Sequence, residues 1–316
     1  MTDPNPNPLE LSIVVVTYNS RRHVRDCLES IQRTAGGIGH EVIVVDNASQ
    51  DGTPDIIRNE FPTTHLIANP ENLGFARACN QGITPSQGRH ILLLNPDTVV
   101  LPKALATLLK EMNQSPETGL LGCRLLNPDR SLQLSFGYEV NIWNEVVRKM
   151  FFNLWENRFF PPVGWIVRSL HSRKREVAWV KGACMLLRRQ ALLDVKLMDE
   201  AFFMYLEDAD LCRRVRKSGW QVRYTPEAEV IHIGGGSVRS NRERSALEHR
   251  RSQLYYFKKH LGEKSLRALK IYLSFKMRIN IRAVNFRQWV GWGATEPLAE
   301  QKQYFQKTLS LVRSYQ

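Results

Sequence analysis

The sequence predicts an α/β protein with a mostly parallel, doubly wound sheet that carries helices on both faces, followed by a helical C-terminal extension. Three observations support this fold class. Short β-branched runs alternate with helix-length segments over the first hundred residues, polar residues gather where those runs end, and the last quarter is basic and helical in pattern. With 43% hydrophobic and 24% charged residues, the 316-residue chain is typical of a folded globular protein.

Four short apolar runs are expected to form buried strands, at residues 11–16, 41–46, 65–68 and 90–95. The first, Leu-Ser-Ile-Val-Val-Val, leaves no face for solvent, as expected of a parallel strand covered on both sides. Helices are predicted between and after these strands, at residues 21–34, from Pro54, at 73–83 and from Pro102. Short connections between strand and helix favour parallel pairing, and ligands of such sheets bind at the carboxyl ends of the strands.

The pattern becomes irregular after Asn127. Residues 138–176 hold seven Phe or Trp interleaved with basic residues, at positions 143, 151, 152, 155, 159, 160 and 165. Regular structure is expected again at residues 177–189, then a helix near 208–217, strands near 221–224 and 229–233, and helix throughout beyond residue 236. We therefore expect a domain of residues 9–238 with an insert at 138–176, and a separate extension of residues 239–316.

The net charge of +13 lies almost entirely in the extension, which has 17 basic and 5 acidic side chains. Such an excess indicates an anionic partner, either nucleic acid or an anionic lipid surface. The longest stretch without a charged side chain, Ala78–Gly88, is too short and polar to span a bilayer, and the N-terminus lacks the pattern of a secretion signal. Five scattered cysteines without a CxxC pair indicate a reducing compartment, so we expect a cytoplasmic protein.

The ends of the predicted strands are rich in Asn, Asp and Gly, at residues 17–19, 46–52, 69–76 and 95–97. The first strand is followed by no GxGxxG motif and the chain contains no GxxxxGK[ST] motif, which argues against a dinucleotide-binding oxidoreductase and a P-loop enzyme. An acidic residue that ends the second strand, Asp46, can accept hydrogen bonds from a nucleobase or ribose. An ordinary Asx turn that caps the next helix explains residues 46–49 at least as well when that segment is considered alone.

Three carboxylates, Glu207, Asp208 and Asp210, begin a predicted helix and complement its dipole. Asp210 is expected to form an i,i+4 pair with Arg214, a structural role. Glu207 and Asp208 lie at the helix start, where a general base can be placed. His232 ends a later strand before a glycine-rich turn, so it is a candidate ligand even though a lone histidine is more often structural.

Taken together, five ordered motifs over residues 9–238 resemble the inverting glycosyltransferases of family 2, which have the GT-A nucleotide-sugar fold. The motifs are Val-Val-Thr-Tyr-Asn at 15–19, Val-Asp-Asn-Ala-Ser-x-Asp-Gly at 45–52, Asn-x-Gly-Phe-Ala-x-Ala-x-Asn-x-Gly at 72–82, Leu-Asn-Pro-Asp at 94–97, and Glu-Asp-x-Asp-Leu-Cys-x-Arg at 207–214 leading to His232. The Asn-Pro-Asp and Asn-Leu-Gly-Phe-Ala segments are similar to the rhamnosyltransferase-like branch, which builds bacterial cell-surface polysaccharides.

The resemblance implies that Asp46 binds the uracil or thymine edge of a nucleotide-sugar. The other residues implied on the donor side are Thr17, Asn19, Asn47 and Asp51 near the nucleoside, and Asn72 and Gly74 along the ribose and diphosphate. Asp97 matches the last residue of the metal-binding DxD motif and His232 the later metal ligand. Asn95 stands where the first Asp of that motif is common, so it is assigned to the donor and not to the metal.

The resemblance also implies the catalytic and acceptor residues. Asp208 corresponds to the catalytic base, with Glu207 beside it, and Trp179, Gly182 and Ala183 correspond to the acceptor side. The implied reaction moves a sugar, with rhamnose suggested by the branch, from a dTDP- or UDP-sugar to a hydroxyl of a glycan or polyprenyl-linked acceptor. The leaving diphosphate calls for Mg²⁺ or Mn²⁺, the acceptor hydroxyl calls for one carboxylate base, and a single displacement inverts the anomeric centre.

Two surfaces leave alternatives open. The aromatic residues of 138–176 are consistent either with core packing or with a loop that meets a lipid-linked acceptor. In the extension, Leu266, Leu269, Leu273, Met277, Ile281 and Val284 fall within about 120° of a helical wheel, whereas Ile271, Phe275 and Ile279 lie elsewhere. We therefore expect the helix to pack partly on the body and partly on an anionic membrane, as a peripheral protein of its inner face with no nucleic-acid partner.

Two other functions were weighed against this one. A sugar nucleotidyltransferase uses a similar sheet but normally shows a glycine-rich basic loop after the first strand, which residues 17–21 do not provide. A basic nucleic-acid-binding or scaffold protein on an inactive transferase fold stays open at this point.

Overall fold

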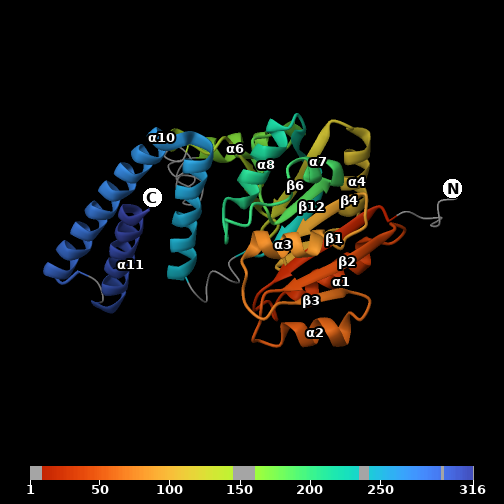
Figure 1. Cartoon of the computed structure of the whole chain (residues 1–316), viewed down its shortest axis with the longest axis horizontal. Coiled ribbons are helices and arrows are strands. Elements are labelled where there is room, and N and C mark those ends of the chain that lie inside the picture. Colours follow the sequence, from red (N-terminus) through yellow and green to blue (C-terminus); the bar gives the residue numbers. More distant parts are fainter. Residues whose placement is uncertain (1–8, 145–160, 235–241, 293–294, 316) are drawn as a thin grey trace.

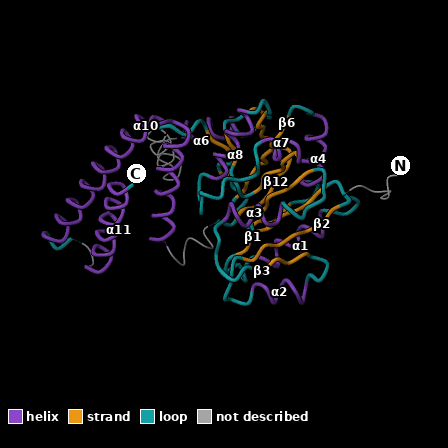
Figure 2. The backbone as a smooth tube through the Cα atoms, in the orientation of Figure 1, coloured by secondary structure: helices purple, strands orange, loops and turns teal. Residues whose placement is uncertain are grey.

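The computed structural model describes residues 9–144, 161–234, 242–292 and 295–315, and its centre is a ten-stranded mixed sheet (Figures 1 and 2). The order along the sheet is β3-β2-β1-β4-β11-β6-β12-β5, with β7 paired to β6 and β9 paired to β12. Its strands are β1 (Leu11–Thr17), β2 (His40–Asp46), β3 (His65–Ala68), β4 (His90–Leu94), β5 (Thr98–Val100), β6 (Thr118–Leu126), β7 (Leu132–Gln133), β9 (Arg175–Glu176), β11 (Cys184–Arg188) and β12 (Gln221–His232). A separate two-stranded sheet pairs β8 (Phe136–Gly137) with β10 (Trp179–Val180).

The N-terminal half of the sheet is parallel, as predicted, because β1 lies between β2 and β4 with all three strands running the same way. All seven residues of β1 are buried. The sheet then becomes mixed, since β11 runs antiparallel between β4 and β6, and β5 runs antiparallel to β12. The two strands expected near 221–224 and 229–233 form one strand, β12, whose register shifts between Thr225 and Glu229. Pro226 lies in that shift and has no N–H to donate.

Helices cover both faces of the sheet (Figure 1). The apolar side chains of α1, α2 and α4 join one buried cluster with one face of the strands, and those of α3, α7 and α8 join a second cluster on the other face. The helices of this body are α1 (Val24–Thr34), α2 (Thr53–Glu60), α3 (Phe75–Ile83), α4 (Ala104–Gln114), α6 (Pro161–Leu170), α7 (Arg189–Asp194) and α8 (Glu207–Lys217). The predicted fold class, a mostly parallel sheet between two helical layers, is confirmed.

The C-terminal extension is helical, as predicted, and consists of α10 (Arg242–Trp289) and α11 (Thr295–Ser314). The two helices lie beside the body in Figure 1. Gly262, at a φ of 75°, interrupts α10, so its two segments run in different directions. The expected apolar stripe faces inward, since Leu266, Leu269, Leu273, Met277 and Val284 are buried. A third cluster joins side chains of both helices to Phe202 and Ala209 of the body.

The aromatic insert contributes little core in its described part. Trp143 and Trp165 are 75% and 70% exposed, so core packing is wrong for these two side chains. The other five, Phe151, Phe152, Trp155, Phe159 and Phe160, lie outside the described residues. Across the ranges that the structure describes, no helix has both the length and the apolar character needed to cross a membrane. All five cysteines are buried and free.

Candidate active site

The carboxyl ends of β1 and β2 meet at one edge of the sheet, where Thr17 and Asp46 are partners in the parallel register. The Thr17 hydroxyl donates to Asp46 Oδ1 over 2.7 Å. Asp46 also accepts from the Ser49 hydroxyl at 2.6 Å and from the Ser49 backbone N–H at 2.9 Å. Asp46 is 1% exposed and holds the turn to Ser49, but it does not cap the next helix, since α2 begins at Thr53 with Gly52 as its N-cap. Binding of a nucleobase edge by Asp46 stays a prediction.

The loops after β1 and β2 are held together by reciprocal bonds. The Asn19 backbone N–H donates to the Ser49 hydroxyl at 2.8 Å, and Asn19 Oδ1 accepts from the Gln50 backbone N–H at 2.9 Å. Asp51 accepts from the Arg21 backbone N–H and from the hydroxyl and N–H of Thr53 at the start of α2. Burial alone raises the pKa of Asp51, but these hydrogen bonds outweigh it and lower the pKa. Asn19 and Asp51 thus lie where the sequence predicts them, as parts of one rigid loop pair.

Asn47, Asn72 and Gly74 also come together. Asn47 Nδ2 donates to the Gly74 carbonyl over 3.0 Å, and the Gly74 N–H donates to Asn72 Oδ1 over 3.0 Å. Gly74 has a φ of 87°, and a Cβ there would lie 2.7 Å from the carbonyl oxygen of Phe203. That carbonyl accepts from the Phe75 N–H at 2.7 Å, so the third motif is tied to the segment that leads into α8.

Asp97 and His232 meet because β5 pairs antiparallel with β12, with Thr98 opposite His232. The Ile233 N–H donates to the Asp97 carbonyl at 2.9 Å, and Asp97 Oδ1 lies 3.5 Å from His232 Nε2. Burial raises the pKa of Asp97, but the hydrogen bond and charge of His232 outweigh it, so the net shift is downward. Two residues 135 positions apart in the sequence are therefore in contact, as the sequence predicts.

The chemistry of this pair fits a divalent cation. Gln133 Oε1 lies 2.7 Å from His232 Nδ1, and because an amide oxygen only accepts, Nδ1 carries the proton. In the protonated ring Nε2–H faces the carboxylate of Asp97 as a donor, whereas in the neutral ring the lone pair of Nε2 faces it, and two acceptors on one side of a shared space then favour a cation between them. Within the described ranges no three His, Cys, Asp or Glu side chains cluster as a metal site, so Asp208 does not lie in one cluster with Asp97 and His232.

Asp208 lies at the start of α8 and is held by backbone donors. The Gly182 N–H donates to Asp208 Oδ2 at 3.0 Å, and the Ala209 N–H donates to Oδ1 at 2.7 Å. Tyr205 and Leu206 precede the helix at φ values of 73° and 65°, in the left-handed region that non-glycine residues rarely adopt. Burial raises the pKa of Asp208, while the N–H of Gly182 and the charge of Lys181 oppose that rise.

Glu207 lies beside Asp208 and differs from it in its environment. Burial, and then the charge of Asp208, raise the pKa of Glu207 to about 8. Its Oε2 is buried, and no hydrogen-bond partner reaches it among the described residues. At neutral pH Glu207 is therefore mostly protonated, and because the charge of Asp208 contributes to that shift, Asp208 is the carboxylate of the pair that loses its proton first.

The segment after β10 joins these residues. The Ala183 carbonyl accepts from the Asn95 N–H at 3.0 Å, which ties the end of β4 to the residue that follows Gly182. Trp179 Nε1 donates to the Tyr138 carbonyl at 2.8 Å. A cavity of about 350 Å³ is lined by the neighbouring residues 136–139 and 175–178 and by Arg216, and it does not include Asp208. The acceptor side at Trp179, Gly182 and Ala183 stays a prediction.

Two residues of this site were not singled out by the sequence, Gln133 and Lys181. Lys181 Nζ donates to Gln133 Oε1 at 2.9 Å, the same oxygen that holds His232. Burial lowers the pKa of Lys181, and the charges of Asp208 and Asp97 oppose that shift. In the sequence, Lys181 is a basic residue that follows a short apolar segment at a strand end, and this feature could have marked it as a candidate site residue. Nothing local marks Gln133, because its role depends on contacts 48 and 99 positions away.

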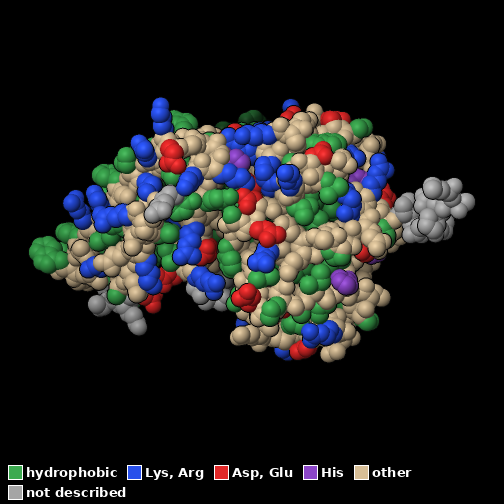
Figure 3. All heavy atoms as spheres, viewed as in Figure 1, with side chains coloured by type: hydrophobic (Ala, Val, Ile, Leu, Met, Phe, Trp, Pro, Cys, Tyr) green, Lys and Arg blue, Asp and Glu red, His purple; other side chains and the backbone are tan. Residues whose placement is uncertain are grey.

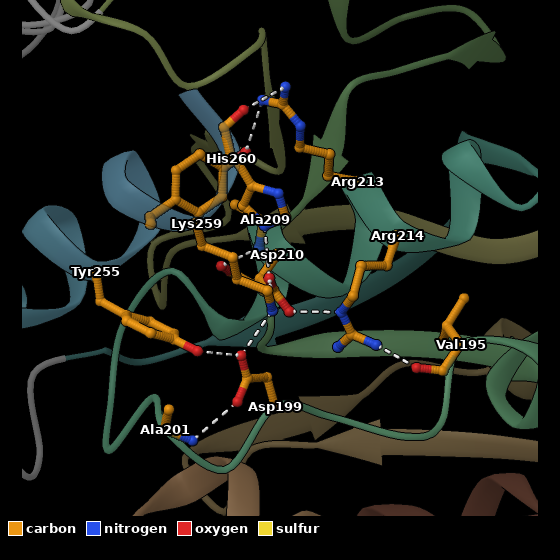
Figure 4. Close-up of polar contacts among 12 residues, drawn as sticks. Val195, Asp199, Ala201, Ala209, Asp210, Arg213, Arg214, Tyr255, Lys259 and His260 are labelled. Carbon is orange, nitrogen blue, oxygen red and sulfur yellow. Dashed lines mark hydrogen bonds and ion pairs between the residues drawn. The ribbon is translucent and has the colours of Figure 1, made fainter. Parts of the chain in front are cut away.

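Asp210 forms the predicted pair with Arg214 and also contacts two residues of α10 (Figure 4). Its side chain is fully buried and accepts from Arg214 Nε at 2.7 Å, as expected, but also from Lys259 Nζ and His260 Nε2 of α10 at 2.6 Å each. Burial raises the pKa of Asp210, but the hydrogen bond of His260 and the charge of Arg214 outweigh it and bring the pKa to about 2. This carboxylate therefore attaches the extension to the helix of the catalytic candidate.

Comparisons with known proteins agree with this geometry. The family model described as Glycosyl transferase family 2 matches residues 12–195. The chain is 30% identical over 268 residues to N-acetylglucosaminyl-diphospho-decaprenol L-rhamnosyltransferase of Mycobacterium tuberculosis, covering 80% of this chain and 85% of that protein. It is 24% identical over 251 residues to rhamnosyltransferase WbbL of Escherichia coli K12, covering 77% of this chain and 91% of that protein.

A solved structure shows the same fold. The mannosyltransferase PcManGT of Pyrobaculum calidifontis, in complex with GDP-Man and Mn²⁺, superimposes with a TM-score of 0.58 at 17% identity over 99% of this chain and 89% of that one. A sheet of this order, with carboxylates and a histidine at its strand ends, defines a glycosyltransferase of GT-A type. The chain belongs to glycosyl transferase family 2, and the resemblance drawn from its motifs is confirmed.

Proposed function

We propose that the protein is an inverting glycosyltransferase that moves a hexosyl group, rhamnose in the first instance, from a dTDP- or UDP-sugar to a hydroxyl of a polyprenyl-linked glycan. The reaction would contribute to bacterial cell-surface polysaccharide. The names of two relatives support this choice, since both are rhamnosyltransferases and one acts on a decaprenol-linked sugar. The donor would lie along residues 17–19, 46–51, 72–74 and 95, and the acceptor on the side of 179–183.

The observation that carries the proposal is the placement of a half-buried carboxylate, Asp208, on the backbone N–H of Gly182. An acceptor hydroxyl has a pKa far above neutral and needs a base within hydrogen-bond reach. Asp208 would take that proton while the acceptor oxygen attacks the anomeric carbon opposite the leaving diphosphate. Glu207, mostly protonated at neutral pH, would keep a second negative charge away from the incoming hydroxyl.

We propose that Asp97 and His232 hold a divalent cation, Mg²⁺ or Mn²⁺. Bound with the donor, such a cation neutralises charge that develops on the leaving diphosphate. Asp97 would supply a carboxylate oxygen and His232 its Nε2. Gln133 fixes the orientation of that ring through Nδ1. The charge pattern at Asp97 and His232 and the donor chemistry both support the assignment.

The test is a panel of dTDP-, UDP- and GDP-sugars offered to the full-length protein with Mn²⁺ and a short polyprenyl-diphosphate sugar. We expect consumption of one donor, formation of a product with the inverted anomeric configuration, and loss of turnover when the cation is chelated. A scaffold on an inactive fold would consume no donor at all. Turnover that survives exhaustive chelation would overturn the cation assignment without removing the transferase.

We also propose that the extension, residues 239–316, attaches the catalytic domain, residues 9–238, to the anionic inner face of the membrane. An exposed apolar stripe runs along the second segment of α10, formed by Ile271, Phe275, Ile279, Phe286 and Trp289. These positions lie on the helix face opposite the buried leucines. Figure 3 shows Lys and Arg gathered over the same helices, with hydrophobic side chains between them. Aromatic and basic residues side by side favour a lipid interface.

Vesicle flotation tests the attachment. We expect the full-length protein to float with vesicles that contain anionic lipid at low salt, and the double variant Phe275→Ser, Trp289→Ser to stay in solution. Leu193→Ser is the matched control, because Leu193 is an exposed apolar residue of the body and its loss should not affect flotation. Equal flotation of the double variant and the wild type would place the lipid contact elsewhere.

A further inference from the structure

Lys181 lies where three parts of the site are joined. Its backbone N–H donates to the Ser135 carbonyl at 2.9 Å. The next residue, Gly182, donates to the Asp208 carboxylate, and the following carbonyl, of Ala183, accepts from Asn95. The backbone of residues 181–183 is therefore held by three hydrogen bonds. It places the Cα of Lys181 next to the segment that contacts both Asp208 and the end of β4.

The far end of the side chain is fixed by Gln133. Gln133 Oε1 accepts from Lys181 Nζ at 2.9 Å and from His232 Nδ1 at 2.7 Å. Its Nε2 donates to Asn127 Oδ1 at 3.0 Å and to the His232 carbonyl at 3.2 Å. Both ends of the Gln133 amide are thus hydrogen-bonded, so its oxygen cannot turn away from Lys181 without losing the three other bonds of that amide.

The charge of Lys181 has no contacting counterion. The ammonium interacts electrostatically with both Asp208 and Asp97, yet neither forms an ion pair with it within 4.0 Å in the described part of the chain. An ammonium has three N–H donors, and Gln133 takes one of them. A half-buried cation with unused donors, at the strand ends where a nucleotide-sugar would bind, is complementary to an anion.

We propose that Lys181 is a further catalytic residue whose ammonium binds the diphosphate of the donor and stabilises the departing nucleoside diphosphate, and that Gln133 is the positioning residue for Lys181 and His232. The inference rests on the proposed function. In the transfer step a bond forms between the acceptor oxygen and the anomeric carbon, and the bond from that carbon to the phosphate oxygen breaks. Its electron pair stays on that oxygen beside Lys181, while the acceptor proton goes to Asp208.

Calorimetric titration separates the diphosphate from the rest of the nucleotide. Full-length wild type and Lys181→Met are titrated, with Mn²⁺ in excess, with dTDP, UDP and GDP and with the matching nucleosides. We expect Lys181→Met to lose about 10- to 100-fold in affinity for the nucleoside diphosphate that the wild type binds most tightly, and to keep its affinity for the nucleoside. Lys181→Arg should retain most of the affinity, and Lys196→Met, at an exposed lysine of the body, is the matched control.

The outcomes are distinct. A wild type that binds no nucleoside diphosphate overturns the proposed function and this inference with it. A wild type that binds one, together with a Lys181→Met variant that binds it equally well, overturns the inference alone. Equal loss for nucleoside and diphosphate shows a merely structural role and also overturns it. If Lys181→Met fails to fold, Lys181→Gln, which keeps a donor for Gln133, must show the same selective loss.

The positioning role of Gln133 has its own measurement, the affinity for Mn²⁺ alone followed by electron paramagnetic resonance. We expect Gln133→Leu to weaken Mn²⁺ binding by about 10- to 100-fold, because His232 loses the acceptor that fixes its ring. Gln133→Glu keeps an acceptor oxygen and should restore most of that affinity. Unchanged Mn²⁺ binding in a folded Gln133→Leu variant overturns the positioning role.

Discussion

The strand-end site and the C-terminal extension are held by different kinds of contact. In the site, three functional side chains accept hydrogen bonds from backbone N–H groups: Asp208 from Gly182, Asn72 from Gly74, and Asp46 from Ser49. The extension is attached by side chains, through the buried ions around Asp210 and an apolar cluster around Phe202. Backbone contacts persist under most substitutions, whereas side-chain contacts can be removed one at a time. We therefore expect substitutions in the site to lower turnover, and substitutions at the attachment of the extension to lower the free energy of unfolding.

The strand-end site and the attachment of the extension share the first turn of α8. Asp208 and Asp210 are two residues apart at the start of α8, so their side chains point to nearly opposite faces. Asp208 faces Gly182 in the site, and Asp210 faces Lys259 and His260 in the extension. Docking of α10 thus supports the helix that presents the base, and substitutions at these two positions separate chemistry from attachment.

The largest effect is expected for Asp208→Asn. The amide keeps the size of the side chain but cannot take a proton, so we expect kcat to fall by about 10²- to 10⁴-fold with donor affinity retained. Burial disfavours the charge of Asp208, whereas the amide can accept from only one of the Gly182 and Ala209 N–H groups, so we expect little net change in the melting temperature. Steady-state turnover, donor titration and thermal unfolding provide the three readouts.

The control for Asp208→Asn is Asp55→Asn, which removes an exposed carboxylate of α2 that pairs with Arg58. We expect it to turn over at the rate of the wild type. Intact turnover in Asp208→Asn would mean that another group takes the acceptor proton, and Glu207→Gln would then be the next variant to measure.

Asp210→Asn should instead act on stability. The amide keeps one acceptor oxygen but carries no charge, so Arg214, Lys259 and His260 lose their shared buried anion, and breaking such a network costs about 3–5 kcal/mol of the free energy of unfolding. Because the pKa of Asp210 is about 2 in the fold against an ordinary 3.8, its contribution is complete above pH 3.8 and is lost as the pH falls toward 2.

Urea unfolding at neutral pH measures this change, again with Asp55→Asn as the exposed control. A loss below about 1 kcal/mol would show that the apolar cluster alone holds the extension, because that value is typical of a surface ion pair. Flotation of the same variant separates the two roles of the extension, since attachment to the body and contact with lipid involve different faces of α10.

The sequence predicted the fold best where structure is local. The run 11–16 identifies β1 because every side chain in it must be buried, and Asp46, Asp97 and Asp208 were placed by motifs that need only a few neighbouring residues. The extension was predicted as helix for the same reason. Its apolar stripe repeats at helical spacing.

The remaining features depend on contacts between distant segments. The meeting of Asp97 with His232 follows from the antiparallel register of β5 and β12, and motif order predicts proximity but not that pairing. Gln133 lies in a two-residue strand whose side chain matters only once His232 and Lys181 have reached it. The i,i+4 spacing predicted the pair of Asp210 with Arg214. Lys259 and His260 of α10 could not be predicted as further partners, because they are about 50 residues away in the sequence.

A smaller effect is expected from His90→Leu, and it tests the sheet apart from the extension. His90 begins β4 and is fully buried, and neither ring nitrogen has a hydrogen-bond partner in the described residues. Burial lowers the pKa of His90 from 6.5 to about 4. Between those values the unfolded chain takes up a proton that the folded chain does not, so stability falls as the pH falls from 6.5 toward 4.

At pH 5 this penalty is about 2 kcal/mol, and leucine removes it without removing any hydrogen bond. We therefore expect the wild type to lose stability from pH 7 to pH 5 and His90→Leu to lose about 2 kcal/mol less over that interval. Urea unfolding at the two pH values measures the difference, with His65→Leu as the control because His65 is exposed at the edge strand β3. The sheet would then weaken between pH 6.5 and 4 and the attachment of the extension only below 3.8, so acid should disturb the sheet first. The same change in the free energy of unfolding between pH 7 and pH 5 for the wild type and His90→Leu would contradict this order.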